Sequence, residues 1–119
     1  MNTPNNINYL EMPAADLPAQ KAFFQTVFQF KFTDYGPEYT AFSAHSAGLE
    51  GGFYKANLQS NTATGAALIV FYSANLSQTE QAIKNAGGQI NKPIFAFPGG
   101  RRFHFLDPNG NEWAVWSDQ

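Results

Sequence analysis

The sequence predicts an α+β fold made of two successive modules, each with the order strand, helix, strand, strand, strand. Short stretches in which apolar and polar residues alternate, bounded by Gly and Pro, are typical of strands. Two further stretches carry apolar residues at helical spacing directly after a capping residue, Asp16 and Asn75. These caps stand 59 residues apart, and the strands before them align at the same offset. The second half of the chain therefore repeats the first.

The first module spans about residues 6–57 and begins with a strand over 7–12. Asp16 caps the helix, and its apolar stripe is predicted to be core: Phe23, Phe24, Val27 and Phe28. Three short strands should follow over 29–33, 39–44 and 50–54. A Tyr-Gly-Pro turn at 35–37 and a loop at 45–48 separate them.

The second module spans about residues 66–117, after a polar linker at 58–65 that shows no periodicity. Its strands are predicted over 66–72, 89–94, 101–106 and 112–116. The helix after Asn75 should stop at Gly87-Gly88, as a helix does at a glycine C-cap. Asp107-Pro108-Asn109-Gly110 has the chemistry of a type I turn between the last two strands. With 119 residues, the two modules are expected to form a single domain, 1–119.

Composition excludes several classes of function. A net charge of −2 offers no general attraction for nucleic acid or for an anionic membrane surface. Because the chain has no Cys, it cannot form a disulfide, a thiolate metal site or a cysteine nucleophile. The first residues are polar and uncharged, which predicts a cytoplasmic protein without a signal peptide.

The residues resemble the vicinal oxygen chelate superfamily, which contains glyoxalase I, bleomycin-resistance proteins, fosfomycin-resistance transferases and extradiol dioxygenases. The resemblance rests on the paired modules, on INYLEMPAADLPAQKAFFQTVFQFKF near the start, on Glu-Gly-Gly at 50–52, and on GGRRFHFLDPNGNEWAVW near the end. It implies a curved, cup-like eight-stranded mixed sheet, with one helix per module on the convex side. It also implies a homodimer.

Members that use a metal hold it with four inward-facing His, Gln or Glu residues. The resemblance places these positions at Tyr9, Gly52, Leu68 and Ala114, none of which is an ordinary ligand. We therefore expect no cofactor and no metal. A divalent metal on the nearby carboxylates Glu11, Glu50 and Glu112 stays open as an alternative.

Alternation along the strands then predicts the residues that face the cup. The expected ligand-binding residues are Tyr9, Phe42, Glu50, Tyr54, Tyr72, Arg102 and Trp116. Glu11 and His104 are the candidate catalytic groups, since a carboxylate or an imidazole among aromatic rings suits acid–base work. Equally, Glu11 could be satisfied by a neighbouring hydroxyl or amide, and His104 could be hydrogen-bonded within the sheet.

Three hypotheses about function follow. The first is a glyoxalase- or bleomycin-resistance-like protein that binds a small aromatic or amphipathic molecule without the usual metal ligands. The second is a glyoxalase-like lyase or isomerase that uses a non-standard metal site or the Glu11 and His104 pair. The third is a purely structural module whose sheet supports dimerisation and binds nothing.

Overall fold

The computed structural model describes residues 2–119, and the chain divides into two compact units that meet between Leu58 and Gln59. The first unit holds β1 (Tyr9–Ala14), α1 (Leu17–Phe28), β2 (Phe32–Asp34), β3 (Tyr39–Phe42), α2 (Ala44–Ala47) and β4 (Glu50–Lys55). The second holds the 3₁₀ turn η1 (Thr62–Thr64), β5 (Ile69–Tyr72), α3 (Leu76–Asn85), β6 (Gln89–Phe97), β7 (Gly100–Leu106) and β8 (Glu112–Ser117).

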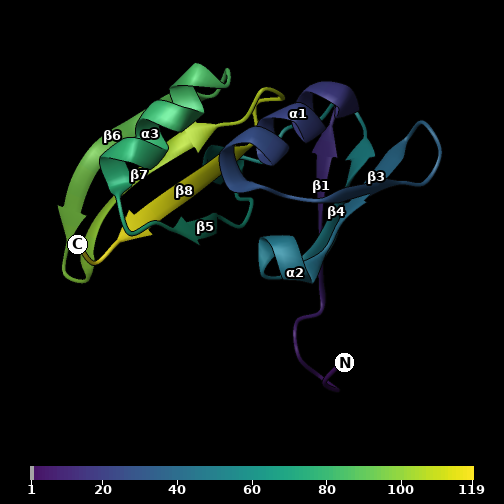
Figure 1. The fold of residues 1–119 in the computed structure, drawn as a ribbon, viewed down its shortest axis with the longest axis horizontal. Coiled ribbons are helices and arrows are strands. Elements are labelled where there is room, and N and C mark those ends of the chain that lie inside the picture. The colour runs from purple at the N-terminus through teal and green to yellow at the C-terminus, as the bar shows by residue number, and fades with distance from the viewer. Residues whose placement is uncertain (1) are drawn as a thin grey trace. The chain divides into compact units, whose positions relative to one another are not determined.

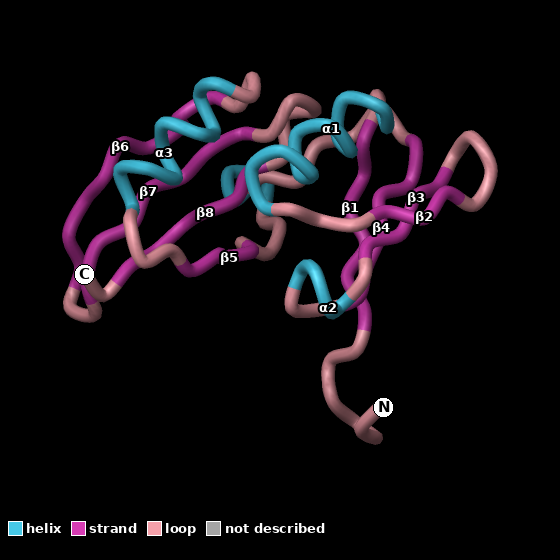
Figure 2. The backbone as a smooth tube through the Cα atoms, viewed as in Figure 1, coloured by secondary structure: helices cyan, strands magenta, loops and turns pink. Residues whose placement is uncertain are grey.

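The predicted α+β class and the repeat are confirmed by the sheet topology. Each unit has a four-stranded mixed sheet, ordered β1-β4-β3-β2 in the first unit and β5-β8-β7-β6 in the second. In both, the first and last strands of the unit pair in parallel, and the other neighbours pair antiparallel. The eight strands thus divide between two sheets with the same order. Figure 2 shows one helix after the first strand of each unit, α1 and α3, and the additional short helix α2 in the first unit.

The predicted helix caps are also confirmed. The Asp16 carboxylate accepts a hydrogen bond from the Ala19 N–H at 3.0 Å, and the Asn75 side chain accepts one from the Gln78 N–H at 3.1 Å. Both side chains satisfy a backbone donor that the first helical turn leaves free. These contacts start α1 and α3 at the predicted places, and Figure 1 shows each helix beside the strands of its own unit.

The core of the first unit is a cluster of phenylalanine rings between α1 and one face of the sheet. Phe24 on α1 lies 5.4 Å from Phe53 on β4, and Phe53 lies 5.6 Å from Phe42 on β3. Phe30 completes the cluster at 5.0 Å from Phe42. Buried aromatic rings at these separations stabilise a fold through both apolar burial and edge or stacking contacts.

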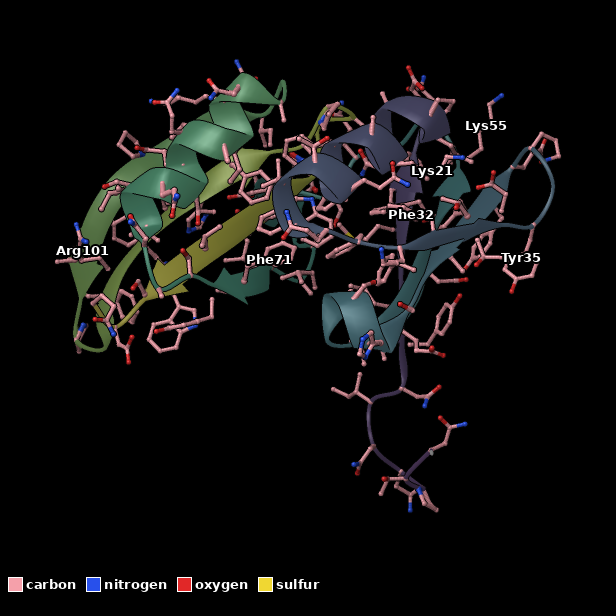
Figure 3. All side chains as sticks on the ribbon, viewed as in Figure 1. Lys21, Phe32, Tyr35, Lys55, Phe71 and Arg101 are labelled. Atoms are coloured by element: carbon pink, nitrogen blue, oxygen red, sulfur yellow. The ribbon has the colours of Figure 1, made fainter. Side chains whose placement is uncertain are left out.

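The core of the second unit lies between α3 and its own sheet. Leu76 and Ile83 on α3 are buried, as are Phe103 and Phe105 on β7. Phe71 on β5, labelled in Figure 3, lies 5.5 Å from Trp113 on β8. The predicted core residues Phe23, Phe24, Phe103 and Phe105 are all buried, and Phe28 is half-buried.

Several predicted boundaries are wrong, for local reasons. The strand expected over 29–33 starts only at Phe32, because Gln29 ends α1 in the left-handed conformation with φ 56°. The loop expected at 45–48 overlaps α2, which Ser43 caps. The strand expected to end at Ile94 runs on to Phe97 through register shifts on both sides of Lys92. The strand expected from 66 begins at Ile69.

The polar segment at 58–65 is not an unattached linker. The Ser60 N–H donates to Asn111 Oδ1 at 2.8 Å, and the Glu112 N–H donates to the Ser60 carbonyl at 2.8 Å. The Asn61 side chain donates to the Gly110 carbonyl at 3.1 Å. The segment is therefore hydrogen-bonded to the turn between β7 and β8, about fifty residues later in the chain. Among residues 2–119, no helix is long and apolar enough to cross a membrane.

Candidate functional site

The first candidate region is the face of the first sheet opposite α1. The register pairs Tyr9 with Glu50 and Glu11 with Gly52, and these residues alternate with the buried Met12 and Ala14. Tyr54 occupies the same face of β4, two residues after Gly52. The predicted residues Tyr9, Glu11, Glu50 and Tyr54 therefore share one face.

Tyr39 is the centre of this face, and the sequence analysis did not single it out. Its hydroxyl lies 2.6 Å from the Tyr9 hydroxyl and donates to Glu11 Oε2 at 3.0 Å. A Cβ added at Gly52 would overlap the end of the Tyr39 ring, so only glycine leaves the ring this path across β4. Strand alternation predicts which face Gly52 lies on, but only the position of the Tyr39 ring explains why this residue is a glycine.

Burial is the main reason that the pKa of Tyr39 rises well above its usual value. The hydrogen bonds with Tyr9 and with Glu11 raise it further, because a phenolate could not donate to the carboxylate. Tyr39 thus stays protonated and keeps donating to Glu11. The Glu11 carboxylate therefore has a neighbouring hydroxyl as a hydrogen-bond partner.

Phe42 lies on the other face, contrary to the prediction that it faces the ligand with Tyr9. Its ring is buried in the aromatic core beside Phe30 and Phe53. The alternation on β3 was assigned one residue out of step, and β3 presents Tyr39 and Ala41 to the Gly52 face instead. Phe42 still borders a hollow of about 290 Å³ that Tyr9, Tyr35, Ala41 and Glu50 also line. Tyr35, labelled in Figure 3, is 66% exposed.

The second candidate region is a buried histidine–carboxylate pair in the second sheet. His104 on β7 and Glu112 on β8 are 3% and 4% exposed, and His104 Nδ1 lies 2.8 Å from Glu112 Oε2. His104 pairs in register with Ala114, and Glu112 is two residues before Ala114 on the same face. The two side chains therefore come from neighbouring strands and lie side by side.

The Glu112 carboxylate is fully engaged by donors. The Thr62 N–H and hydroxyl donate to Oε1 at 2.9 and 2.8 Å, and the Asn91 amide donates to Oε2 at 3.3 Å. Burial by itself would raise the pKa of Glu112, but the hydrogen bonds from His104 and Thr62 outweigh it and lower the pKa to about 2. Glu112 is consequently ionised at neutral pH.

An ionised carboxylate only accepts hydrogen bonds, so His104 Nδ1 carries a proton and donates it to Glu112. The other ring nitrogen, Nε2, is buried and has no hydrogen-bond partner among the described residues. A histidine held by a carboxylate in this way presents its other ring nitrogen in a fixed orientation, an arrangement used both in acid–base catalysis and in ligand binding.

Aromatic side chains lie on the same sheet, and one of them, Phe95, is 5.9 Å from the His104 ring. The Arg102 guanidinium lies 5.3 Å from the Phe95 ring centre and 5.7 Å from that of Phe97. Trp116 lies 6.4 Å from Phe97 and 5.2 Å from Tyr72. We call the set Tyr72, Phe95, Phe97, Arg102 and Trp116 the aromatic face. Tyr72, Arg102 and Trp116 were predicted to bind ligand; Phe95 and Phe97 were missed because the strand was predicted to end at Ile94.

The four positions that the resemblance assigns to metal ligands carry Tyr, Gly, Leu and Ala. Tyr9 is engaged with Tyr39, whereas Gly52, Leu68 and Ala114 carry no donor side chain. Of the alternative trio Glu11, Glu50 and Glu112, the last already accepts four hydrogen bonds. Within residues 2–119, no group of three or more His, Asp or Glu side chains could hold a metal ion.

Comparison with known proteins agrees with this fold. Residues 6–115 match the family model described as the Glyoxalase/Bleomycin resistance protein/Dioxygenase superfamily. None of the curated proteins matches the sequence.

Three solved structures illustrate the similarity. A glyoxalase-related enzyme from Fulvimarina pelagi is 16% identical, with a TM-score of 0.77 over 95% of this chain and 88% of that one. A fosfomycin resistance protein from Listeria monocytogenes is 18% identical, with a TM-score of 0.77 over 97% and 94%. A lactoylglutathione lyase from Agrobacterium tumefaciens is 17% identical, with a TM-score of 0.71 over 97% and 95%. At such identities the likeness concerns the fold alone.

Proposed function

Because the chain belongs to the Glyoxalase/Bleomycin resistance protein/Dioxygenase superfamily, we propose that it binds a small aromatic or amphipathic molecule on the aromatic face of its second sheet. The observation that carries the proposal is the Arg102 guanidinium, which lies within 6 Å of two phenylalanine ring centres. Tyr72 and Phe95 are 52% and 36% exposed, so their rings present apolar surface to a ligand.

The chemistry of the face suits such a ligand. Flat rings offer stacking surfaces, and the guanidinium adds a positive charge that can also stack. The ion pairs recorded among residues 2–119 are Lys21 with Asp34 and His104 with Glu112, so no described carboxylate neutralises Arg102. An aromatic molecule with an acidic group would use both properties.

Tryptophan fluorescence tests the proposal, because the chain has two Trp with different surroundings. Trp113 is buried and donates to Asp107 Oδ2 at 2.9 Å, whereas Trp116 belongs to the aromatic face. Phenylacetate and indole-3-acetate should quench the emission with saturation and raise the melting temperature. Trp116→Phe should remove the quenching. Saturable quenching that persists in Trp116→Phe, or no binding of either compound, would contradict the proposal.

The buried His104 and Glu112 pair favours a second candidate function, a lyase or isomerase that transfers protons. His104 Nε2 would be the base and Glu112 would hold the imidazole in position. Glu11, the other predicted catalytic group, accepts the Tyr39 hydroxyl at Oε2, so Oε1 would be the oxygen that takes a proton. Turnover of methylglyoxal with glutathione, together with metal analysis of the purified protein, tests this candidate.

The third hypothesis is a purely structural module whose sheet supports dimerisation and which binds no ligand, so specific binding of either aromatic compound would contradict it. A charge-poor, aromatic-rich chain suits an apolar contact between two copies. Light scattering after size exclusion measures the oligomeric state directly. A monomer at all concentrations would contradict the expected homodimer.

A further inference from the structure

The hollow of about 290 Å³ on the first sheet combines aromatic rings with one carboxylate. Its lining includes Tyr9, Tyr35 and Phe42, and Glu50 is the charged residue among the described residues that line it. Tyr9 and Tyr35 are exposed, so their rings offer surface to a ligand, whereas Phe42 belongs to the buried core. Pockets for small molecules usually measure about 300–1,000 Å³, so a hollow of this size suits a small ligand.

Tyr39 holds two of these residues beside the hollow. Its hydroxyl proton is donated to Glu11, so the 2.6 Å hydrogen bond between the two tyrosine hydroxyls is donated by Tyr9. Tyr35 lies in the turn between β2 and β3, where its N–H donates to the Tyr39 carbonyl at 3.0 Å. The Tyr9 side chain and the Tyr35 backbone therefore have fixed positions before any ligand arrives.

The charged side chains on this face of the first sheet are acidic. Glu50 pairs in register with Tyr9, and Glu11 stands two residues after Tyr9 on the same face. The basic residue in the four strands of this sheet is Lys55, which lies on the opposite face, two residues after the buried Phe53. No Lys, Arg or His lines the hollow among the described residues. A positively charged ligand would therefore meet attraction here and no like charge.

The combination of rings and a carboxylate favours a methylated ammonium group. The face of an aromatic ring attracts a cation, and several rings together are used to recognise quaternary ammonium ligands. An ammonium with N–H groups would leave donors unpaired where it contacts rings, which is unfavourable. A trimethylammonium group has no N–H, and its methyl groups offer apolar surface to the rings.

We propose that this hollow binds the trimethylammonium group of a small molecule, with Tyr9 and Tyr35 against its methyl groups and Glu50 opposite its charge. The site belongs to the first unit and takes a ligand of the opposite charge to the acidic aromatic molecule considered for the second unit. It thus goes beyond the proposed function and does not depend on it.

Isothermal titration calorimetry with choline tests the site. The control ligand is 3,3-dimethylbutan-1-ol, which has the shape of choline but carries carbon in place of the charged nitrogen. Choline should bind at least about tenfold more tightly, because only the cation is attracted by the rings and by Glu50. Equal affinity for the two compounds, or no binding of choline, would overturn the proposal.

A pair of carboxylate variants tests the role of Glu50. Glu50→Gln should weaken choline binding about fivefold, the size expected when one exposed charge interaction is lost. Glu38→Gln removes the same charge from an exposed position that does not line the hollow, and it should bind choline as the parent protein does. Circular dichroism checks that both variants fold. The same choline affinity in both variants would show that Glu50 is not opposite the cation and would overturn the site.

Two variants of Tyr35 test the contribution of the ring. Tyr35→Leu keeps an apolar side chain but removes the ring, so choline binding should weaken about two- to fivefold, as expected for an exposed cation–π contact. Tyr35→Phe keeps the ring and should bind choline as the parent protein does. Unchanged affinity in Tyr35→Leu, or an equal loss in Tyr35→Phe, would contradict a cation held against this ring.

The trimethylammonium group also occurs in phosphatidylcholine and in trimethylated lysine side chains, so a final comparison separates these sources. Because the hollow is small, free choline should bind at least as tightly as Nα-acetyl-trimethyllysine amide. The protein should also stay in the supernatant when phosphatidylcholine vesicles are sedimented. Tighter binding of the lysine derivative, or sedimentation with the vesicles, would overturn the assignment to a small molecule.

Discussion

The Tyr39 hydroxyl lies 3.0 Å from Glu11 Oε2, although β4 separates their strands in the sheet. The contact exists because Gly52, the residue of β4 between them, has no side chain. Because this residue is a glycine, two polar side chains from β1 and β3 can form a hydrogen bond across the strand between them.

Gly52→Ala should lower the free energy of unfolding by about 1–3 kcal/mol, the usual cost of overpacking. The new methyl group would overlap the Tyr39 ring and would lie 2.8 Å from the Thr40 carbonyl. Urea denaturation measures the loss. In a Tyr39→Ala background the same change should cost less, since only the backbone contact remains. If Gly52→Ala lowered the free energy of unfolding equally in both backgrounds, overlap with the Tyr39 ring would not be the cause of the loss.

Tyr39→Phe should make the protein less sensitive to alkaline pH. The folded state raises the pKa of Tyr39, mainly through burial, so the unfolded chain loses this proton first, near the ordinary value of 10.0. Stability must then fall as the pH rises above about 10. Removing the hydroxyl removes this part of the fall, as measured by urea denaturation at several pH values. Tyr35→Phe, at an exposed position, should behave like the parent protein.

Glu112→Gln should make the free energy of unfolding less dependent on pH below pH 4.5. The carboxyl has an ordinary pKa of 4.5, and hydrogen bonds from His104 and Thr62 lower it to about 2 in the folded state, against the opposing effect of burial. Its contribution is present above pH 4.5 and is lost as the pH falls towards 2. The variant should also be less stable at neutral pH by about 1–3 kcal/mol, because the new amide NH2 would face hydrogen-bond donors and leave a buried donor unpaired. Glu38→Gln, on the surface, is the control.

Thr62→Val should loosen the segment at 58–65. It removes the hydroxyl bond to Glu112 Oε1, worth about 1 kcal/mol, and keeps the size of the side chain. Limited proteolysis should cut this segment faster in the variant. Thr64→Val removes only a hydrogen bond to Asn61 within the segment, so it should be cut more slowly than Thr62→Val. The same rate in both variants would contradict a specific role for the Glu112 contact.

Much of the fold was predictable because its signals are local. The caps Asp16 and Asn75, the phenylalanine stripe of α1 and the turn at Asp107 each depend on residues a few positions apart. The errors arose in the strands. Assigning alternate residues to the two faces of a sheet depends on which residue is taken as the first, and on where the strand is taken to end. On β3, an assignment that was one position out of step placed Phe42 on the face that Tyr39 and Ala41 occupy. On β6, ending the predicted strand at Ile94 left out Phe95 and Phe97.

The sequence by itself determined the two repeated modules and the family resemblance. Only the tertiary structure decided the partners of the polar side chains. Thr62 reaches Glu112 across 50 residues of sequence, and Tyr39 reaches Glu11 across 28. Such contacts leave no periodic signal, because they depend on strand register and on how the segment at 58–65 packs. The sequence pointed to His104 as a single residue, but only the structure shows that Glu112 contacts its Nδ1 and that its Nε2 has no hydrogen-bond partner among the described residues.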